Sequence, residues 1–153
     1  MKENIKTKEA LYSKCLEFIE NRFQTVQKNI QELQESLLSE TKSSAGDKHE
    51  TGRAMLQLER EKLGNQLSEI HKIKVYFYKI DISKPSKIIG LGSVVYTSNA
   101  NYFIAISAGE IVVDGVKFFA ISSSTPIGIL LMGKQVGDTI VFREQRFVVK
   151  EVV

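Results

Sequence analysis

The fold of this chain is decided by residues 12–37, which read YSKCLEFIENRFQTVQKNIQELQESL. Apolar residues recur in this stretch at alternating spacings of four and three positions. They are Tyr12, Leu16, Ile19, Phe23, Val26, Ile30, Leu33 and Leu37. Such a seam, sustained over more than three heptads, predicts one helix of a coiled coil. We expect that helix to cover about residues 8–42.

A second seam follows after the polar stretch at residues 41–46, TKSSAG. Its positions are Leu56, Arg60, Leu63, Leu67, Ile70, Lys74 and Phe77, so two of them are basic. Two seams joined by a short turn fold back on each other. We therefore predict an antiparallel coiled-coil hairpin over residues 1–77, with its tip near residues 43–50.

Residues 78–153 contain short β-branched and aromatic runs interrupted by Gly, Asn and Ser, a pattern typical of strands and turns. We predict strands at 88–96, 102–107, 110–113, 116–121, 139–142 and 147–152, with turns at 98–101, 114–115 and 143–146. Thr125, Pro126 and Gly133 mark the start and the end of one short helix. The expected fold class is α+β, with the hairpin followed by an antiparallel β-sheet around that helix.

The composition excludes several classes of protein. The chain has 153 residues, a net charge of +3 and one cysteine. Cys15, His49 and His71 cannot form a disulfide framework or a zinc site with several cysteines. No run of about 18 apolar residues and no signal-peptide core occurs, so we expect a cytoplasmic protein without membrane contact. No Walker A motif, GxSxG motif or Ser/His/Asp set indicates catalysis by the chain alone.

Asp47 and Glu50 are the candidate site residues, in the predicted tip sequence GDKHE at residues 46–50. Positions three apart share one face of a helix, so the two carboxylates can converge. Mg²⁺ commonly takes one or two protein carboxylates. The same spacing is also typical of a capping box at a helix start. The two interpretations are compatible, and the sequence leaves both open.

Other polar residues have two interpretations as well. Arg53, Arg60 and Lys62 can form a basic strip along the second helix, or they can pair with acids of the first helix. Those acids are Glu32, Glu35 and Glu40. Cys15 lies beside the seam and is interpreted as a packing residue. His49 is interpreted as a solvated tip residue, and His71 as a flank of the second seam.

Three motifs together resemble the GreA/GreB family of bacterial transcript-cleavage factors, over about residues 8–152. Residues 46–50 are similar to that family's Gly-Asp-x-x-Glu tip motif. Residues 80–84, IDISK, and 90–95, GLGSVV, resemble its linker and the first strand of its C-terminal domain. Residues 125–138, TPIGILLMGKQVGD, resemble its Ser-Pro-hydrophobic-Leu-Gly-Lys-x-x-Gly-Asp signature, which is the most specific of the three.

The resemblance implies an FKBP-like C-terminal domain at residues 78–153 that binds RNA polymerase, and a coiled coil that enters the polymerase secondary channel. Asp47 and Glu50 would then act in the polymerase active site and hold Mg²⁺ jointly with the polymerase, next to the nascent RNA 3′ end. The chain would be a monomeric transcription elongation factor that stimulates the polymerase's own cleavage of backtracked RNA. It would not be an enzyme itself.

The chain also departs from the family pattern. After the tip Glu the family commonly continues Asn-Ala-Glu-Tyr, whereas residues 51–54 here are TGRA. The nearest alternative is therefore a secondary-channel regulator that binds in the same way without stimulating cleavage. An FKBP-like domain also allows a prolyl isomerase or chaperone, although strand alternation places most of the aromatic residues in the core. Those are Tyr102, Phe103, Phe118, Phe119, Phe142 and Phe147. A coiled-coil adaptor is the third alternative.

Overall fold

The computed structural model describes the backbone of residues 2–42 and 46–153, and the side chains of residues 3–39 and 52–153. The chain divides into two compact units. One is Ile19–Val75, and the other joins Met1–Phe18 to Tyr76–Val153. Each unit is described by itself below.

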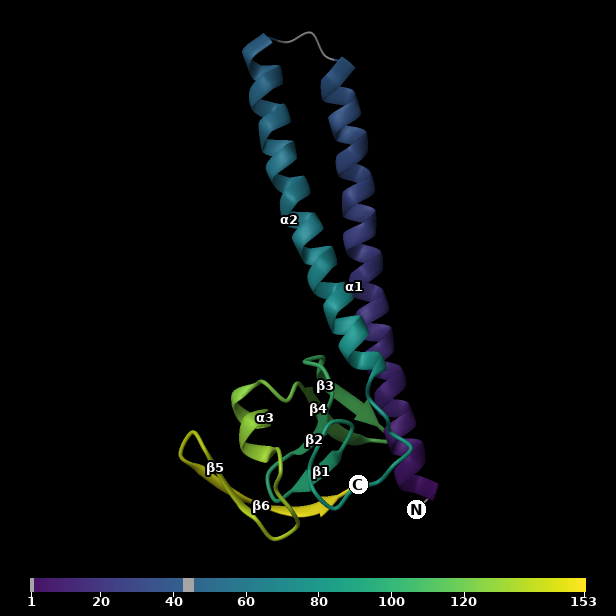
Figure 1. The fold of residues 1–153 in the computed structure, drawn as a ribbon, viewed down its shortest axis with the longest axis vertical. Helices are drawn as coiled ribbons and strands as arrows, with labels where there is room; N and C mark the ends of the chain where they lie inside the picture. Colours follow the sequence, from purple (N-terminus) through teal and green to yellow (C-terminus); the bar gives the residue numbers. More distant parts are fainter. Residues whose placement is uncertain (1, 43–45) are drawn as a thin grey trace. The chain divides into compact units, whose positions relative to one another are not determined.

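The unit Ile19–Val75 consists of two long helices that lie side by side (Figure 1). They belong to α1 (Lys2–Lys42) and α2 (Gly46–Tyr78). The buried residues between them are Ile19, Val26, Leu33, Leu63 and Ile70. All five are seam positions, so the predicted hairpin is confirmed. α1 begins earlier than residue 8, and α2 begins inside the predicted tip, of which residues 43–45 lie outside the described part of the chain.

The remaining turns of the two helices belong to the second unit. Leu11, Cys15 and Phe77 are fully buried there, and Tyr12 stacks on Phe77 with ring centroids 4.3 Å apart. The predicted domain division at residues 77 and 78 stays a prediction, since α2 ends at Tyr78 while the compact unit also takes in the start of α1. None of the helices, over the residues described, is long and apolar enough to cross a membrane.

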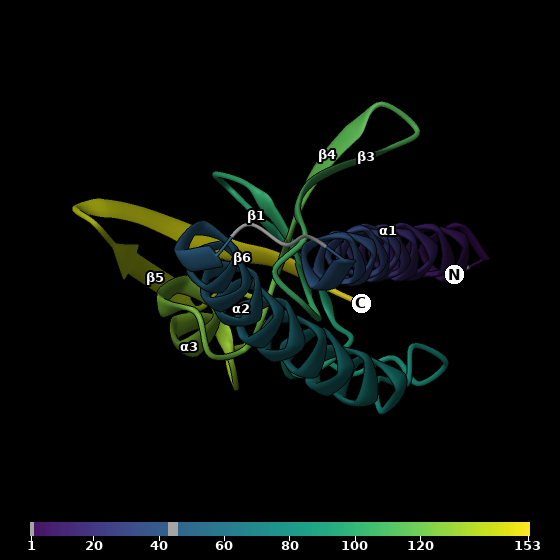
Figure 2. The same cartoon turned by 90° about the horizontal axis from the view of Figure 1, so that it is seen from above.

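The β-domain is a six-stranded sheet in the order β3-β4-β2-β1-β6-β5. The strands are β1 (Val94–Thr97), β2 (Asn101–Ile104), β3 (Gly109–Val113), β4 (Val116–Ile121), β5 (Thr139–Phe142) and β6 (Gln145–Val152). In Figure 2 the β3–β4 and β5–β6 hairpins extend from the sheet in different directions. The α+β fold class, with one short helix in this domain, is confirmed.

One strand pairing corrects the prediction of a purely antiparallel sheet. β2 pairs with β4 in parallel, with Tyr102 opposite Phe119. The reason is that β3 takes the outer edge and turns back at Asp114 and Gly115. β4 therefore enters between β3 and β2, in the same direction as β2.

The predicted strand at residues 88–96 is also too long, because β1 begins at Val94. The preceding residues form a turn, in which the Ser93 N–H donates to the Gly90 carbonyl oxygen at 3.0 Å. Gly92 has φ +89°, and a Cβ there would lie 3.1 Å from Ile80 Cγ2. The left-handed backbone and the close approach both require glycine, so the strand pattern is interrupted.

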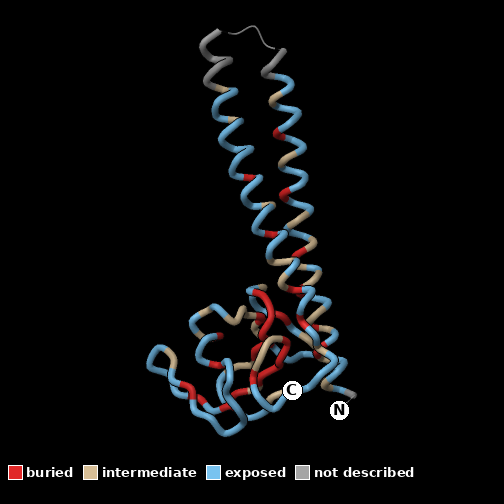
Figure 3. Tube along the Cα trace, viewed as in Figure 1, coloured by how far each residue is buried: buried red, intermediate tan, exposed pale blue. Residues whose placement is uncertain are grey.

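The short helix α3 (Pro126–Leu131) forms as predicted. Thr125 is its N-cap, and its Oγ1 accepts a hydrogen bond from the Gly128 N–H at 3.2 Å. Leu131 is fully buried and packs in a hydrophobic core cluster of the domain. Figure 3 shows the buried stretches of the β-domain in red. The other buried members of that cluster are Ile89, Val95, Tyr102, Ile104, Ile140, Phe147 and Val149.

Candidate functional site at the distal end of the hairpin

Asp47 and Glu50 lie in the first turns of α2, three residues apart on helical backbone. Residues at this spacing share one face of the helix. The two positions therefore fit a contribution of one or two oxygen ligands to Mg²⁺. Their side chains, and that of His49, lie outside the described side chains. The metal-binding and capping interpretations both stay predictions.

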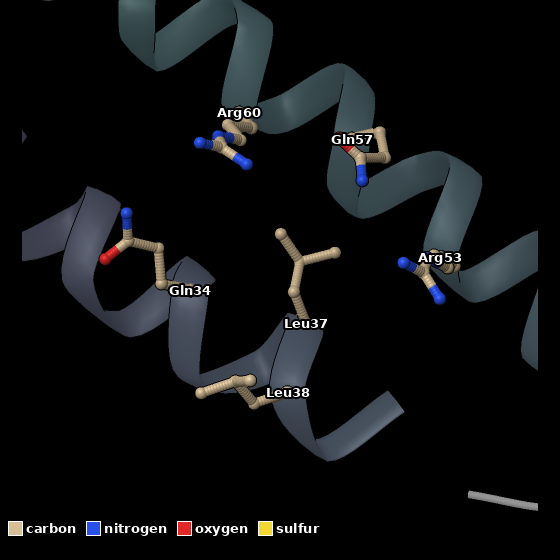
Figure 4. A pocket seen from close by; sticks show the side chains of 6 residues that line it. All are labelled: Gln34, Leu37, Leu38, Arg53, Gln57 and Arg60. Atoms are coloured by element: carbon tan, nitrogen blue, oxygen red, sulfur yellow. The ribbon is translucent and has the colours of Figure 1, made fainter. Parts of the chain in front are cut away.

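A groove lies between α1 and α2 next to these positions, with a volume of about 390 Å³. Gln34, Leu37 and Leu38 line it from α1, and Arg53, Gln57 and Arg60 line it from α2. Figure 4 shows Leu37 pointing toward α2, with the Arg60 side chain on the side of Gln34. Leu38 is 63% exposed although it is a large apolar residue. We call this surface the arginine groove.

A second groove between the same helices has a different character. It is lined by Ser36, Ser39, Gly52, Met55 and Leu56, and its volume is about 460 Å³. None of these lining residues carries a charge. The described side chains of α1 and α2 therefore line both a basic groove and a groove of small and apolar residues.

Among the described side chains, the cations of the arginine groove do not pair with the acids of the first helix. No ion pair joins Arg53, Arg60 or Lys62 to Glu32 or Glu35 in the part of the chain whose side chains are described. The Glu40 side chain lies outside that part. The structure therefore favours the basic-strip interpretation for Arg53 and Arg60. Lys62 does not line the groove.

The other polar candidates behave as packing or surface residues. Burial raises the pKa of the Cys15 thiol to about 12, which agrees with a packing role. His71 is exposed on α2. Among the described residues, no group of three or more His, Cys, Asp or Glu could hold a metal ion.

Most of the aromatic residues of the β-domain are in the core, as predicted. The buried ones are Tyr102, Phe103, Phe118 and Phe147.

Two features were missed by the sequence interpretation. One is a set of residues that line the groove: Gln34, Leu38 and Gln57. Each directly follows a seam position, and this is the feature of the sequence that could have indicated them. Lys8 is only 3% exposed, although position 8 lies one residue before the position at which the first seam would continue. Burial lowers the pKa of Lys8, and the Asp81 carboxylate partly opposes that shift. Hydrogen bonds from Ser83, whose N–H lies 2.9 Å from Asp81 Oδ1, lower the pKa of Asp81.

These elements define a class of protein: an antiparallel coiled-coil hairpin with two acidic positions at its turn, followed by a small mixed β-domain. No protein-family model matches the chain, and no curated protein matches it.

Two solved structures are similar. The chain is 21% identical to GreA factor homolog 1 (Gfh1) of Thermus thermophilus, over 90% of this chain and 93% of that one, with a TM-score of 0.37. A second structure, of the transcription factor Gfh1, is 20% identical over 84% of this chain and 90% of that one, with a TM-score of 0.31. Both scores indicate a weak overall superposition, and the architecture rests on the elements described above.

Proposed function

We propose that the chain is a transcription factor that binds RNA polymerase through its β-domain and inserts its hairpin into the polymerase secondary channel. The support is the family signature at residues 125–138. Its capping, glycine and acidic residues each have a local structural role in this chain. Thr125 caps α3, and Gly133 and Gly137 adopt positive φ angles of 81° and 94°. The Asp138 carboxylate accepts a hydrogen bond from the Gln135 N–H at 2.8 Å.

The finer proposal is that the factor stimulates cleavage of backtracked RNA. The observation that carries it is the placement of Asp47 and Glu50 on one face of the first turns of α2. Their carboxylates would provide oxygen ligands beside the RNA 3′ end, and the polymerase would supply the remaining ligands. Mg²⁺ bound there would activate a water molecule for cleavage of the RNA. The chain itself contributes only the two carboxylates and their negative charge, so the nuclease activity belongs to the polymerase.

A transcript-cleavage assay on backtracked elongation complexes of the matching polymerase tests this proposal. The wild-type chain is compared with the double variant Asp47→Asn, Glu50→Gln. The matched control is Glu61→Gln, which removes one negative charge from an exposed position further along α2. We expect stimulation by the wild type and by Glu61→Gln, and loss of it in the double variant with polymerase binding retained. Equal stimulation by all three would overturn the role of the tip carboxylates.

A second candidate function is a regulator that binds in the same way without stimulating cleavage. Its support is the sequence after Glu50, where Arg53 and Ala54 are both exposed and stand in place of the acidic and aromatic residues of the family pattern. Polymerase binding together with reduced RNA synthesis, and no cleavage, would favour this function in the same assay. Robust cleavage would exclude it.

A further inference from the structure

We propose that the arginine groove is a docking site for an acidic α-helix of a partner protein. This inference goes beyond the proposed function, because it concerns a surface to which neither the tip carboxylates nor the β-domain contributes. It rests on the charges, the apolar exposure and the spacing of the residues that line the groove.

The charges of the groove favour an acidic partner. Lys74 and Arg60 both occupy positions of the second seam. Lys74 is matched by Glu20, with Nζ 2.9 Å from the carboxylate oxygen. Arg60 instead shares the groove with Gln34 and Leu37, and the described residues that line the groove include no carboxylate. Among these described residues, two guanidinium groups beside two amides form a surface complementary to carboxylates, which arginine binds in a bidentate way.

The spacing of the two arginines fits a helical partner. Arg53 and Arg60 are seven residues apart on α2, which corresponds to two helical turns, or about 10.5 Å along the axis. A partner helix with acidic residues at heptad spacing presents its carboxylates at that same distance. Such a helix, lying along the groove, would pair both cations at once. Its apolar residues would contact Leu38, whose side chain is otherwise left in water.

The residues that line the groove suit a helix better than a single-stranded nucleic acid. Nucleic-acid grooves commonly combine many cations with aromatic rings on which bases stack. The lining of the arginine groove, over the residues whose side chains are described, contains two cations and no aromatic residue. It does contain two leucines, which suit the apolar face of an amphipathic helix.

Fluorescence anisotropy with the full chain tests the proposal. The probe is a labelled amphipathic peptide of about 20 residues, long enough to form a helix, with Leu along one seam and Glu at positions seven apart. A matched peptide carries Gln in place of each Glu, and a labelled single-stranded RNA is the third probe. The variants are Arg60→Gln and Leu38→Ser. Lys62→Gln is the control, because it removes the same charge from an exposed position on α2 outside the groove.

We expect the acidic peptide to bind at least about tenfold more tightly than the Gln peptide. Arg60→Gln and Leu38→Ser should each weaken that binding by about tenfold, with unchanged helical circular dichroism, and Lys62→Gln should leave it unchanged. Equal affinity for the two peptides, or no binding of either, would overturn the proposal. It would also be overturned if RNA bound more tightly than the acidic peptide and lost its affinity in Arg60→Gln.

Discussion

The Lys74 ammonium lies 2.9 Å from a Glu20 carboxylate oxygen, in an ion pair between the two helices of the hairpin. It also lies 5.1 Å from the centroid of the Phe23 ring. Lys74 occupies a seam position at which a coiled coil normally places an apolar residue. The neighbouring carboxylate and ring face stabilise the charge at that position. Arg60, at another seam position, lies beside Gln34 and Leu37 instead.

Replacing Glu20 by Gln should therefore destabilise the hairpin. The side chains of Lys74 and Glu20 are 26% and 40% exposed, so solvent screens the pair in part. We expect the free energy of unfolding to fall by about 0.5–1 kcal/mol. The control is Glu17→Gln, since the Lys14–Glu17 pair is 3.8 Å long and well exposed. Urea unfolding should show a change below about 0.3 kcal/mol for that control. Equal losses in both variants would contradict the assigned role of Glu20.

Replacing Arg60 by Leu should have the opposite effect on stability. It restores an apolar residue to the seam between Leu56, Leu63 and Leu67. Among the described side chains, the change removes no ion pair. We expect the free energy of unfolding to rise by about 0.5–1 kcal/mol. Lys62→Leu, away from the seam, should give no such gain in the same urea experiment. Arg60→Leu should also lose affinity for the acidic peptide, so the arginine serves recognition at the expense of stability.

The hairpin could be predicted from the sequence because a heptad seam is a local signal. Ile19, Val26 and Leu33 are buried as the spacing requires, and so are Leu63 and Ile70. The short helix was also predictable, because Thr125 and Pro126 act through adjacent backbone groups. For the candidate site, the sequence predicts where Asp47 and Glu50 lie along α2. The direction of their side chains depends on contacts that spacing does not determine.

The parallel pairing of β2 with β4 could not be predicted in the same way. It depends on which strand takes the edge of the sheet, and no local pattern in Tyr102 or Phe119 encodes that choice. The turn at Gly92 was missed because its cause lies in another segment. Ile80 and Asp81 pack tightly against Gly92, whose φ of +89° favours glycine. Lys8 was missed because it lies outside the seam, and a charged residue there is expected to be exposed.

Gly128 lies inside α3, where alanine would normally be the better helix former. A Cβ at this position would overlap the Ser122 carbonyl oxygen and lie 2.8 Å from Thr125 Oγ1. We expect Gly128→Ala to lower the free energy of unfolding by about 2 kcal/mol or more, because the clash is with backbone. The matched control is Gly64→Ala in α2, where nothing lies within 4 Å of the added Cβ. The free energy of unfolding of that variant should instead rise by about 1 kcal/mol, as measured by thermal or urea unfolding.

The turn between β5 and β6 contains two residues other than glycine with positive φ, Arg143 at 47° and Glu144 at 68°. Side chains with a Cβ rarely adopt this conformation, so the turn is strained. Glu144→Gly should raise the free energy of unfolding by about 0.5–1 kcal/mol. In the turn between β3 and β4, Gly115 has φ +78° and open space around it. Gly115→Ala should lower the free energy of unfolding by about 1 kcal/mol, through backbone strain alone. Unfolding changes of the same sign in both variants would contradict this account.

Cys15 should be unreactive in the folded protein. Its side chain is fully buried, and burial raises the pKa of its thiol to about 12. Because the thiolate is the reactive form, we expect modification by iodoacetamide at pH 8 to be at least about 100-fold slower in buffer than in urea. Rapid modification in buffer would show that α1 opens readily around this residue.

The raised pKa of Cys15 also predicts how stability depends on pH. In the unfolded chain the thiol loses its proton near its ordinary pKa of 9.0, whereas in the folded protein it keeps the proton until about pH 12. The unfolded state therefore binds fewer protons between these values, and the free energy of unfolding falls as the pH rises from 9 to 12. The Cys15→Ala variant is less stable at the outset because the substitution leaves a cavity. Its free energy of unfolding should nevertheless fall less than that of the wild type between pH 9 and 12. Urea unfolding at several pH values compares the two slopes, and parallel curves above pH 9 would contradict the burial of the thiol.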